Sequence, residues 1–234
     1  MEKHRMFKQN LKRFRRRLFE SFGSDRYSRP SLKNIDRTLE KYLNYRNGFF
    51  IEVGGNDGFN QSNTYYFERF RCWNGILVEA IPELYEECVK ERPRSKVFNY
   101  ALISEDYQDT HATMIYSNLR SLVKGAQKSD ENDIKHAYDM NHLKKSSVKP
   151  YEISVPVRTL TSILDECHVQ EIDLFSLDVE GYELNVLKGL DFNKYQPKYM
   201  LIEARFRNEI EEYISDLYIQ IDQFSHHDFL YKLK

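Results

Sequence analysis

The sequence predicts an α/β protein with a mostly parallel sheet covered by helices on both faces. Apolar, strand-like segments alternate with helix-like segments along most of the chain, a glycine-rich turn directly follows the first strand, and acidic residues follow several later strands. Alternating strand–helix units favour a parallel sheet with both faces covered. The 234 residues suit one such domain with a short extension.

The expected elements follow one another from residue 31 onward. Ser31 resembles the N-cap of a helix over 31–46, whose apolar stripe is Ile35, Leu39 and Leu43. Further helices are expected at 64–70, 82–91, 160–167, 183–190 and 208–217. The sheet is expected to contain seven strands: 49–53, 75–79, 96–102, 174–178, 199–204, 218–224 and 228–233. A tight turn joins the last two, so one terminal strand should be antiparallel.

Residues 103–150 break this rhythm between the third and fourth strands of the expected sheet. A strand is expected at 112–116 and a polar helix at 129–145, with His136 on its solvated face. Such an insertion is a natural place for a lid or a substrate loop.

The N-terminal segment is strongly basic. Residues 1–20 carry eight Lys and Arg against two Glu, a local charge of +6, which leaves −7 for the remainder. Phe7, Leu11, Phe14 and Leu18 recur at helical spacing, which predicts a basic amphipathic helix. This helix could dock on the domain, join a second copy in a homodimer, or contact an anionic membrane surface. We expect 1–30 to be this helix and a linker, and 31–234 to be the domain.

Bulk composition argues against several classes of protein. The net charge of −1 disfavours binding to nucleic acid by bulk electrostatics. The cysteines Cys72, Cys88 and Cys167 are too few and too widely spaced for a disulfide framework or a zinc site. No run approaches the roughly 20 apolar residues of a membrane span, and we find no apolar signal core. We therefore expect a cytoplasmic protein.

Two features point to an adenosine-type cofactor. The turn Glu52-Val53-Gly54-Gly55-Asn56-Asp57-Gly58 follows the first strand, where glycine allows a sharp turn and close approach to a ligand. Glu79 ends the second strand, 27 residues after Glu52, where a carboxylate can accept both hydroxyls of a ribose. Together they predict a cofactor at the carboxyl edge of the sheet.

A third feature is the acidic segment Asp178-Val179-Glu180-Gly181-Tyr182-Glu183 after the fourth strand. Three carboxylates this close suit a substrate hydroxyl, a positively charged cofactor or a metal. Glu203 ends the fifth strand at the same edge and could join them, or form a salt bridge with Arg205 or Arg207.

These stretches resemble the FkbM-type methyltransferases, which transfer methyl from S-adenosylmethionine, usually to oxygen. The resemblance covers most of 49–204 and is carried by FFIEVGGNDGFNQSNTYYFERF, WNGILVEAIPELYEEC, VPVRTLTSIL, IDLFSLDVEGYELNVLKGL and YMLIEA. It implies a Rossmann-like class I methyltransferase fold with a seven-stranded, mostly parallel sheet. Gly55 stands where alanine is common in the family.

The resemblance also implies a cofactor site. Residues after the first strand would hold the methionine portion of the cofactor, and Glu79 would bind the ribose hydroxyls. Residues after the third strand would lie near the adenine, and Asp178 would lie near the methyl group that is transferred. The expected contacts are Glu52, Gly54, Asn56, Asp57, Gly58, Ser62, Asn63, Thr64, Glu79, Ala80, Asn99, Tyr100, Ala101 and Asp178.

The expected reaction is methylation of a hydroxyl of a sugar, a glycan or a related metabolite. A carboxylate can accept the hydroxyl proton, so we expect Asp178 or Glu180 to be the base, with Glu203 assisting. A divalent metal held by these residues with His111 would also be compatible with oxygen ligands, but the spacing does not favour it. The sequence also permits an NAD-dependent oxidoreductase, although a full GxGxxG motif is missing, and a non-catalytic membrane- or partner-binding scaffold.

Overall fold

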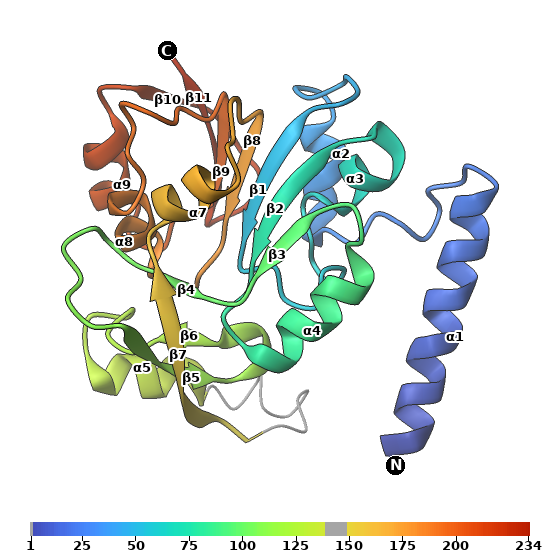
Figure 1. The fold of residues 1–234 in the computed structure, drawn as a ribbon, viewed down its shortest axis with the longest axis horizontal. Helices are drawn as coiled ribbons and strands as arrows, with labels where there is room; N and C mark the ends of the chain where they lie inside the picture. Colours follow the sequence, from blue (N-terminus) through green and yellow to red (C-terminus); the bar gives the residue numbers. More distant parts are fainter. Residues whose placement is uncertain (1, 139–148) are drawn as a thin grey trace.

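The computed structural model describes residues 2–138 and 149–234. Its main sheet has seven strands (Figure 1). From one edge to the other they are β10 (Tyr218–Gln223), β11 (Asp228–Leu233), β9 (Tyr199–Glu203), β8 (Leu174–Leu177), β1 (Phe49–Val53), β2 (Asn74–Val78) and β3 (Lys96–Phe98). Neighbours from β9 to β3 pair in parallel, whereas β11 is antiparallel to both β9 and β10. The expected sheet is confirmed, and its antiparallel strand lies inside the edge rather than at it.

Helices cover both faces of this sheet because successive strand residues point to opposite sides. On one face, Ile51 and Val53 of β1 pack in a cluster with α7 (Leu160–Glu166), α8 (Glu183–Lys188) and α9 (Arg207–Ile214). On the other face, Phe50 packs with α2 (Ile35–Leu39), α3 (Tyr65–Arg71) and α4 (Pro82–Glu91). These two apolar layers fix the strand register, and hence the position of each strand end.

The insertion and the strands on either side of it form a second, smaller sheet. Its order is β4 (Ala101–Leu102), β7 (Tyr151–Arg158), β5 (His111–Tyr116) and β6 (Leu122–Val123), with α5 (Asp130–Ala137) beside it. The expectation of one strand over 96–102 is therefore wrong. The chain leaves the main sheet after Phe98, where the Asn99 side chain donates to the carbonyls of Glu79 and Ala80 at 2.9 Å each. Part of the helix expected at 129–145 lies outside the described residues.

The helix expected at 31–46 is also much shorter. A 3-10 turn, η1 (Leu32–Asn34), precedes α2, and positive φ angles of 50° and 58° at Lys33 and Asn34 interrupt the helix. Ser31 makes no capping hydrogen bond; its hydroxyl donates to Asn63 Oδ1 at 2.6 Å. The apolar stripe is still buried, so these side chains pack in the core although the segment is not a continuous helix.

The N-terminal helix α1 (Glu2–Ser21) lies at the edge of the molecule beside α4 (Figure 1). Arg13 and Arg16 on α1 form ion pairs with the buried Glu91 of α4. Among the described residues, no helix combines the length and the apolar content needed to cross a bilayer.

Candidate active site

A pocket opens at the carboxyl ends of β1, β2 and β8, where α/β proteins of this topology bind their ligands. It contains about 950 Å³ of space free of atoms, including its open mouth. The turn after β1 and the ends of β2, β4 and β8 form one side. The insertion forms the opposite wall with Met114, Asn118, Leu119, Ser121 and Val123.

The turn after β1 depends on glycine at two positions. Gly54 has φ +84°, and a Cβ there would lie 2.0 Å from the backbone oxygen of Asp178. Gly58 has φ +79°, and its Cβ would lie 2.9 Å from Arg92 Cγ. Gly54 thus lets β1 and β8 end side by side at the pocket, whereas Gly58 serves packing and does not line the pocket. At Gly55 an added Cβ would lie an ordinary 3.4 Å from Leu77, so this position has room for a methyl group.

Glu52 organises the segment that follows this turn. Its carboxylate accepts hydrogen bonds from the Ser62 hydroxyl at 2.8 Å, the Asn63 backbone N–H at 2.8 Å and the Thr64 hydroxyl at 2.6 Å. Arg92, which is fully buried, donates to Glu52 at 3.2 Å. Glu52, Ser62 and Asn63 line the pocket, whereas Thr64 is completely buried behind it.

Arg92 was not identified from the sequence because it follows a helix as an ordinary basic residue. Its guanidinium also donates to Glu68 at 2.8 Å and to Thr64 Oγ1 at 2.8 Å. The contacts join three segments that are far apart in sequence, so no local pattern could reveal them.

Glu79 lies at the end of β2, where the sequence placed it. One carboxylate oxygen accepts the Asn56 N–H at 2.7 Å and the other accepts the Ile81 N–H at 2.8 Å. Burial raises its pKa to about 7. Glu79, Ala80, Tyr100 and Ala101 all line the pocket.

Most of the expected cofactor residues meet in this pocket. Those lining it are Glu52, Gly54, Asn56, Ser62, Asn63, Glu79, Ala80, Tyr100, Ala101 and Asp178. Asp57, Gly58, Thr64 and Asn99 do not line it. Asp57 instead shapes the turn, because its carboxylate accepts the backbone N–H groups of Phe59 at 3.0 Å and Asn60 at 2.7 Å.

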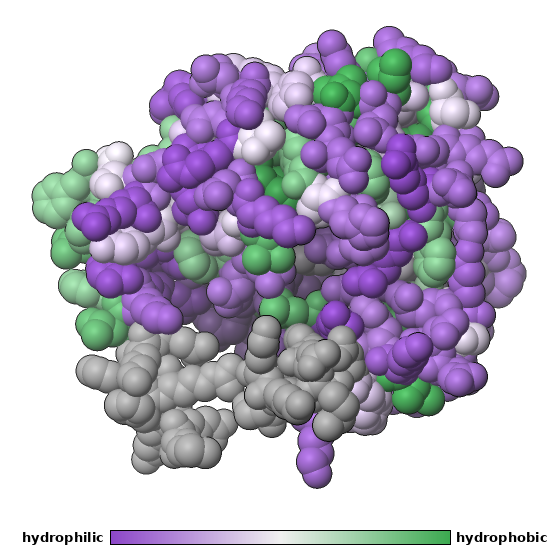
Figure 2. Space-filling view, turned by 180° about the vertical axis from the view of Figure 1, so that it is seen from behind, coloured by the Kyte–Doolittle hydropathy of each residue, from purple (hydrophilic) through white to green (hydrophobic). Residues whose placement is uncertain are grey.

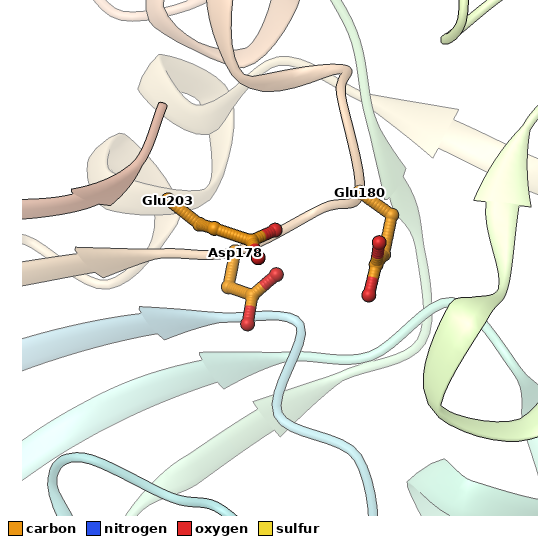
Figure 3. A group of neighbouring side chains, drawn as sticks. All are labelled: Asp178, Glu180 and Glu203. Carbon is orange, nitrogen blue, oxygen red and sulfur yellow. The ribbon is translucent and has the colours of Figure 1, made fainter. Parts of the chain in front are cut away.

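The three expected catalytic carboxylates also come together (Figure 3). Asp178, Glu180 and Glu203 each offer an oxygen within 4.8 Å of the others. His111, on the exposed start of β5, is not part of this group. Asp178 and Glu180 line the pocket, whereas Glu203 lies behind Asp178 and does not.

Asp178 and Glu203 behave as a pair. The Asp178 carboxyl is open to the pocket but enclosed by protein, and this burial, together with the charges of Glu203 and Glu180, raises its pKa well above the ordinary value. The pKa of Glu203 is also raised, chiefly by burial and by the charge of Glu180. Repulsion between two neighbouring carboxylates favours a state in which one of them holds a proton.

Glu180 is held from two sides. It has a positive φ of 56°, followed by Gly181 at +105°, which turns the chain sharply after β8. Its carboxylate forms an ion pair with Arg205 and contacts His136 Nε2 at 2.8 Å. The expectation that His136 is solvated is therefore wrong: it is buried and connects α5 of the insertion to this turn. The spacing of a polar helix gave no signal for such a contact.

Arg205 also lies 3.6 Å from Glu203, so the salt bridge considered from the sequence is present alongside the contact with Asp178. Glu183 has a different place from the other acids. It is fully buried, accepts the N–H groups of Gly181 at 2.9 Å and Val179 at 3.2 Å, and has its pKa raised to about 7 by burial. Glu183 therefore stabilises the turn.

The charge of the lining distinguishes between cofactors. Its acidic residues are Glu52, Glu79, Asp178 and Glu180, and no Lys, Arg or His is among the described lining residues. Such a surface disfavours the pyrophosphate of a dinucleotide and favours a positively charged ligand. The sequence model of a protein family, the methyltransferase FkbM domain, matches residues 52–233 of this chain. The chain belongs to the FkbM methyltransferase family. It is therefore an S-adenosylmethionine-dependent methyltransferase, and not an NAD-dependent oxidoreductase.

The two solved structures compared below share 10% sequence identity with this FkbM methyltransferase. No curated protein is detectably similar to it in sequence. Among solved structures, it resembles a TehB-like S-adenosylmethionine-dependent methyltransferase from Corynebacterium glutamicum, with 10% identity, a TM-score of 0.43, and coverage of 96% of this chain and 97% of the other. The fibrillarin/Nop5p complex gives 10% identity, a TM-score of 0.40, and coverage of 87% and 80%.

The residues present fit the cofactor. The acidic lining matches a sulfonium and an ammonium group, and Glu79 lies where ribose hydroxyls bind in folds of this topology. Tyr100, Ala101 and Leu84 provide an apolar wall suited to an adenine ring.

Proposed function

We propose that this FkbM methyltransferase methylates a hydroxyl group of a sugar, a glycan or a related polar metabolite, with Asp178 as the general base. The proposal rests mainly on the neighbouring carboxyls of Asp178 and Glu203. Asp178 lines the pocket together with the strand ends that suit the cofactor and with residues of the insertion, and Glu203 lies behind it.

A hydroxyl must lose its proton as it attacks, so it needs a base within reach. When bound, S-adenosylmethionine supplies a methyl group on a positively charged sulfonium. The raised pKa of Asp178 brings this carboxyl toward the working pH, where a base is most effective. Glu203 lies beside Asp178 and can share the accepted proton, while Arg205 limits the repulsion among the acids.

The remaining polar residues of the lining support a polar, hydroxylated acceptor. Asn60, Gln61, Asn118 and Ser121 offer amides and a hydroxyl that can exchange hydrogen bonds with several hydroxyl groups. Leu119 adds an apolar surface between them, as the less polar face of a sugar ring would require.

A methyl-transfer screen with isotope-labelled S-adenosylmethionine tests this proposal. The panel contains sugars, nucleotide-sugars and glycolipids, with amines and carboxylic acids for comparison, and mass spectrometry locates the methyl group. We expect an O-methyl ether on a hydroxylated acceptor. Transfer only to nitrogen or to a carboxylate would contradict the proposal.

The same assay tests the expectation that no metal is required. We expect turnover to survive treatment with a chelator. Loss of turnover that Mg²⁺ restores would instead make Asp178, Glu180 and Glu203 a metal site.

A further inference from the structure

The helix α1 presents an apolar surface away from the protein. Leu11, Phe14 and Leu18, together with Phe22 just past the helix end, are between 45% and 82% exposed. We call these four residues the outer stripe. Figure 2 shows hydrophobic residues along the edge of the molecule where α1 lies. A helix that served only to cover this domain would turn such a stripe inward.

The opposite side of α1 is the one that docks. Arg13, Arg16 and Glu20 recur at helical spacing, roughly half a turn from the outer stripe. Arg16 is buried over the Phe59 ring at 3.5 Å and pairs with Glu91, and Arg13 pairs with Glu91 at 2.6 Å.

Glu20 completes this docked side through contacts with α3. It accepts hydrogen bonds from Tyr65 at 2.8 Å and from Arg69 at 2.7 Å. Buried polar contacts therefore fix the rotation of α1, and this rotation leaves the outer stripe in solvent.

Cationic side chains border the outer stripe. Lys12 and Arg15 are exposed on one flank, with the Arg15 guanidinium over the Tyr27 ring at 4.1 Å. Residues 1–20 carry +6, whereas the rest of the chain carries −7. An anionic surface would thus attract α1 and repel the remainder.

We propose that α1 binds the surface of an anionic lipid bilayer, with the outer stripe inserted among the acyl chains and Lys12 and Arg15 at the headgroups. A stripe of apolar residues bordered by Lys and Arg is the pattern of interfacial helices. A second copy is a poorer occupant, because pairing two such helices would bring Lys12 and Arg15 of both copies together.

Vesicle co-sedimentation of the full chain tests this proposal. Phosphatidylcholine vesicles are compared with phosphatidylcholine–phosphatidylserine vesicles. We expect binding to the anionic vesicles, about tenfold or more weaker for Leu11→Gln/Phe14→Gln and for Lys12→Gln/Arg15→Gln. The matched control Leu32→Gln/Ile219→Gln removes two similarly exposed apolar side chains elsewhere and should bind as the wild type does.

Thermal unfolding shows whether the variants fold, and we expect unchanged transitions because the substituted side chains face outward. Equal binding to both kinds of vesicle, or full binding by Leu11→Gln/Phe14→Gln, would overturn the proposal. So would a wild-type dimer in analytical ultracentrifugation that Leu11→Gln/Phe14→Gln converts to a monomer, because the outer stripe would then seat a second copy.

Discussion

Replacing Arg92 by methionine should destabilise the protein strongly. Arg92 is fully buried and is the cation that faces two buried carboxylates, Glu68 at 2.8 Å and Glu52 at 3.2 Å. Methionine retains much of the volume but leaves both carboxylates without this partner. Removing one member of a buried ion pair costs about 3–5 kcal/mol, a large part of the roughly 5–15 kcal/mol that holds a domain folded.

Urea unfolding followed by circular dichroism measures this loss. Arg207→Met is the matched control, because Arg207 pairs with Glu211 at 2.8 Å on a partly exposed surface, where such a pair contributes about 0–1 kcal/mol. Affinity for S-adenosylhomocysteine should fall in Arg92→Met as well, since Glu52 positions the segment at 62–64. A loss of free energy of unfolding no larger than that of the control would show that Arg92 does not stabilise the two buried carboxylates.

Three further predictions concern pH, the β1 turn and the insertion. Burial raises the pKa of both Glu79 and Glu183 from 4.5 to about 7, so these carboxyls take up protons when the protein folds. The stability that this proton uptake contributes is fully present below about pH 4.5 and is lost as the pH rises through 7. The ligand-free protein should therefore be more stable at pH 5 than at pH 8. Thermal unfolding across this range checks it, and the slope should flatten in Glu79→Gln and Glu183→Gln. Gly54→Ala should lower the free energy of unfolding by at least about 1–3 kcal/mol and weaken cofactor binding, because the new Cβ would lie 2.0 Å from a backbone oxygen and the residue has a positive φ. The free energy of unfolding of the control Gly55→Ala should stay within about 1 kcal/mol of the wild-type value. His136→Gln should lower kcat roughly 10- to 100-fold with little change in affinity for S-adenosylhomocysteine, because His136 positions the carboxylate of Glu180. An unchanged kcat would mean that His136 has a purely structural role.

The seven-stranded sheet was predictable because its signals are local. Each strand is an apolar run bounded by turn residues, and Gly54 and Glu79 follow two of those runs directly. The topology of a parallel sheet then brings the strand ends to one edge, so most of the pocket lining could be named from the sequence.

The errors arise where distant segments decide the structure. The strand expected at 96–102 divides because Asn99 bonds back to the end of β2, and the expected solvated position of His136 ignores a partner 44 residues later, Glu180. Thr64 and Gly58, which were expected to contact the cofactor, pack against Arg92 and do not line the pocket. Local propensity carries no information about these contacts.

In the proposed reaction, Asp178 accepts the proton of the hydroxyl group during methyl transfer at this pocket. Turnover and S-adenosylhomocysteine affinity of Asp178→Asn, measured once an acceptor is identified, test it most directly. The amide keeps the shape of the side chain but cannot act as the base, so we expect kcat to fall about 10²–10⁴-fold while affinity for the product cofactor stays close to that of the wild type. Wild-type turnover in Asp178→Asn would mean that Asp178 is not the general base.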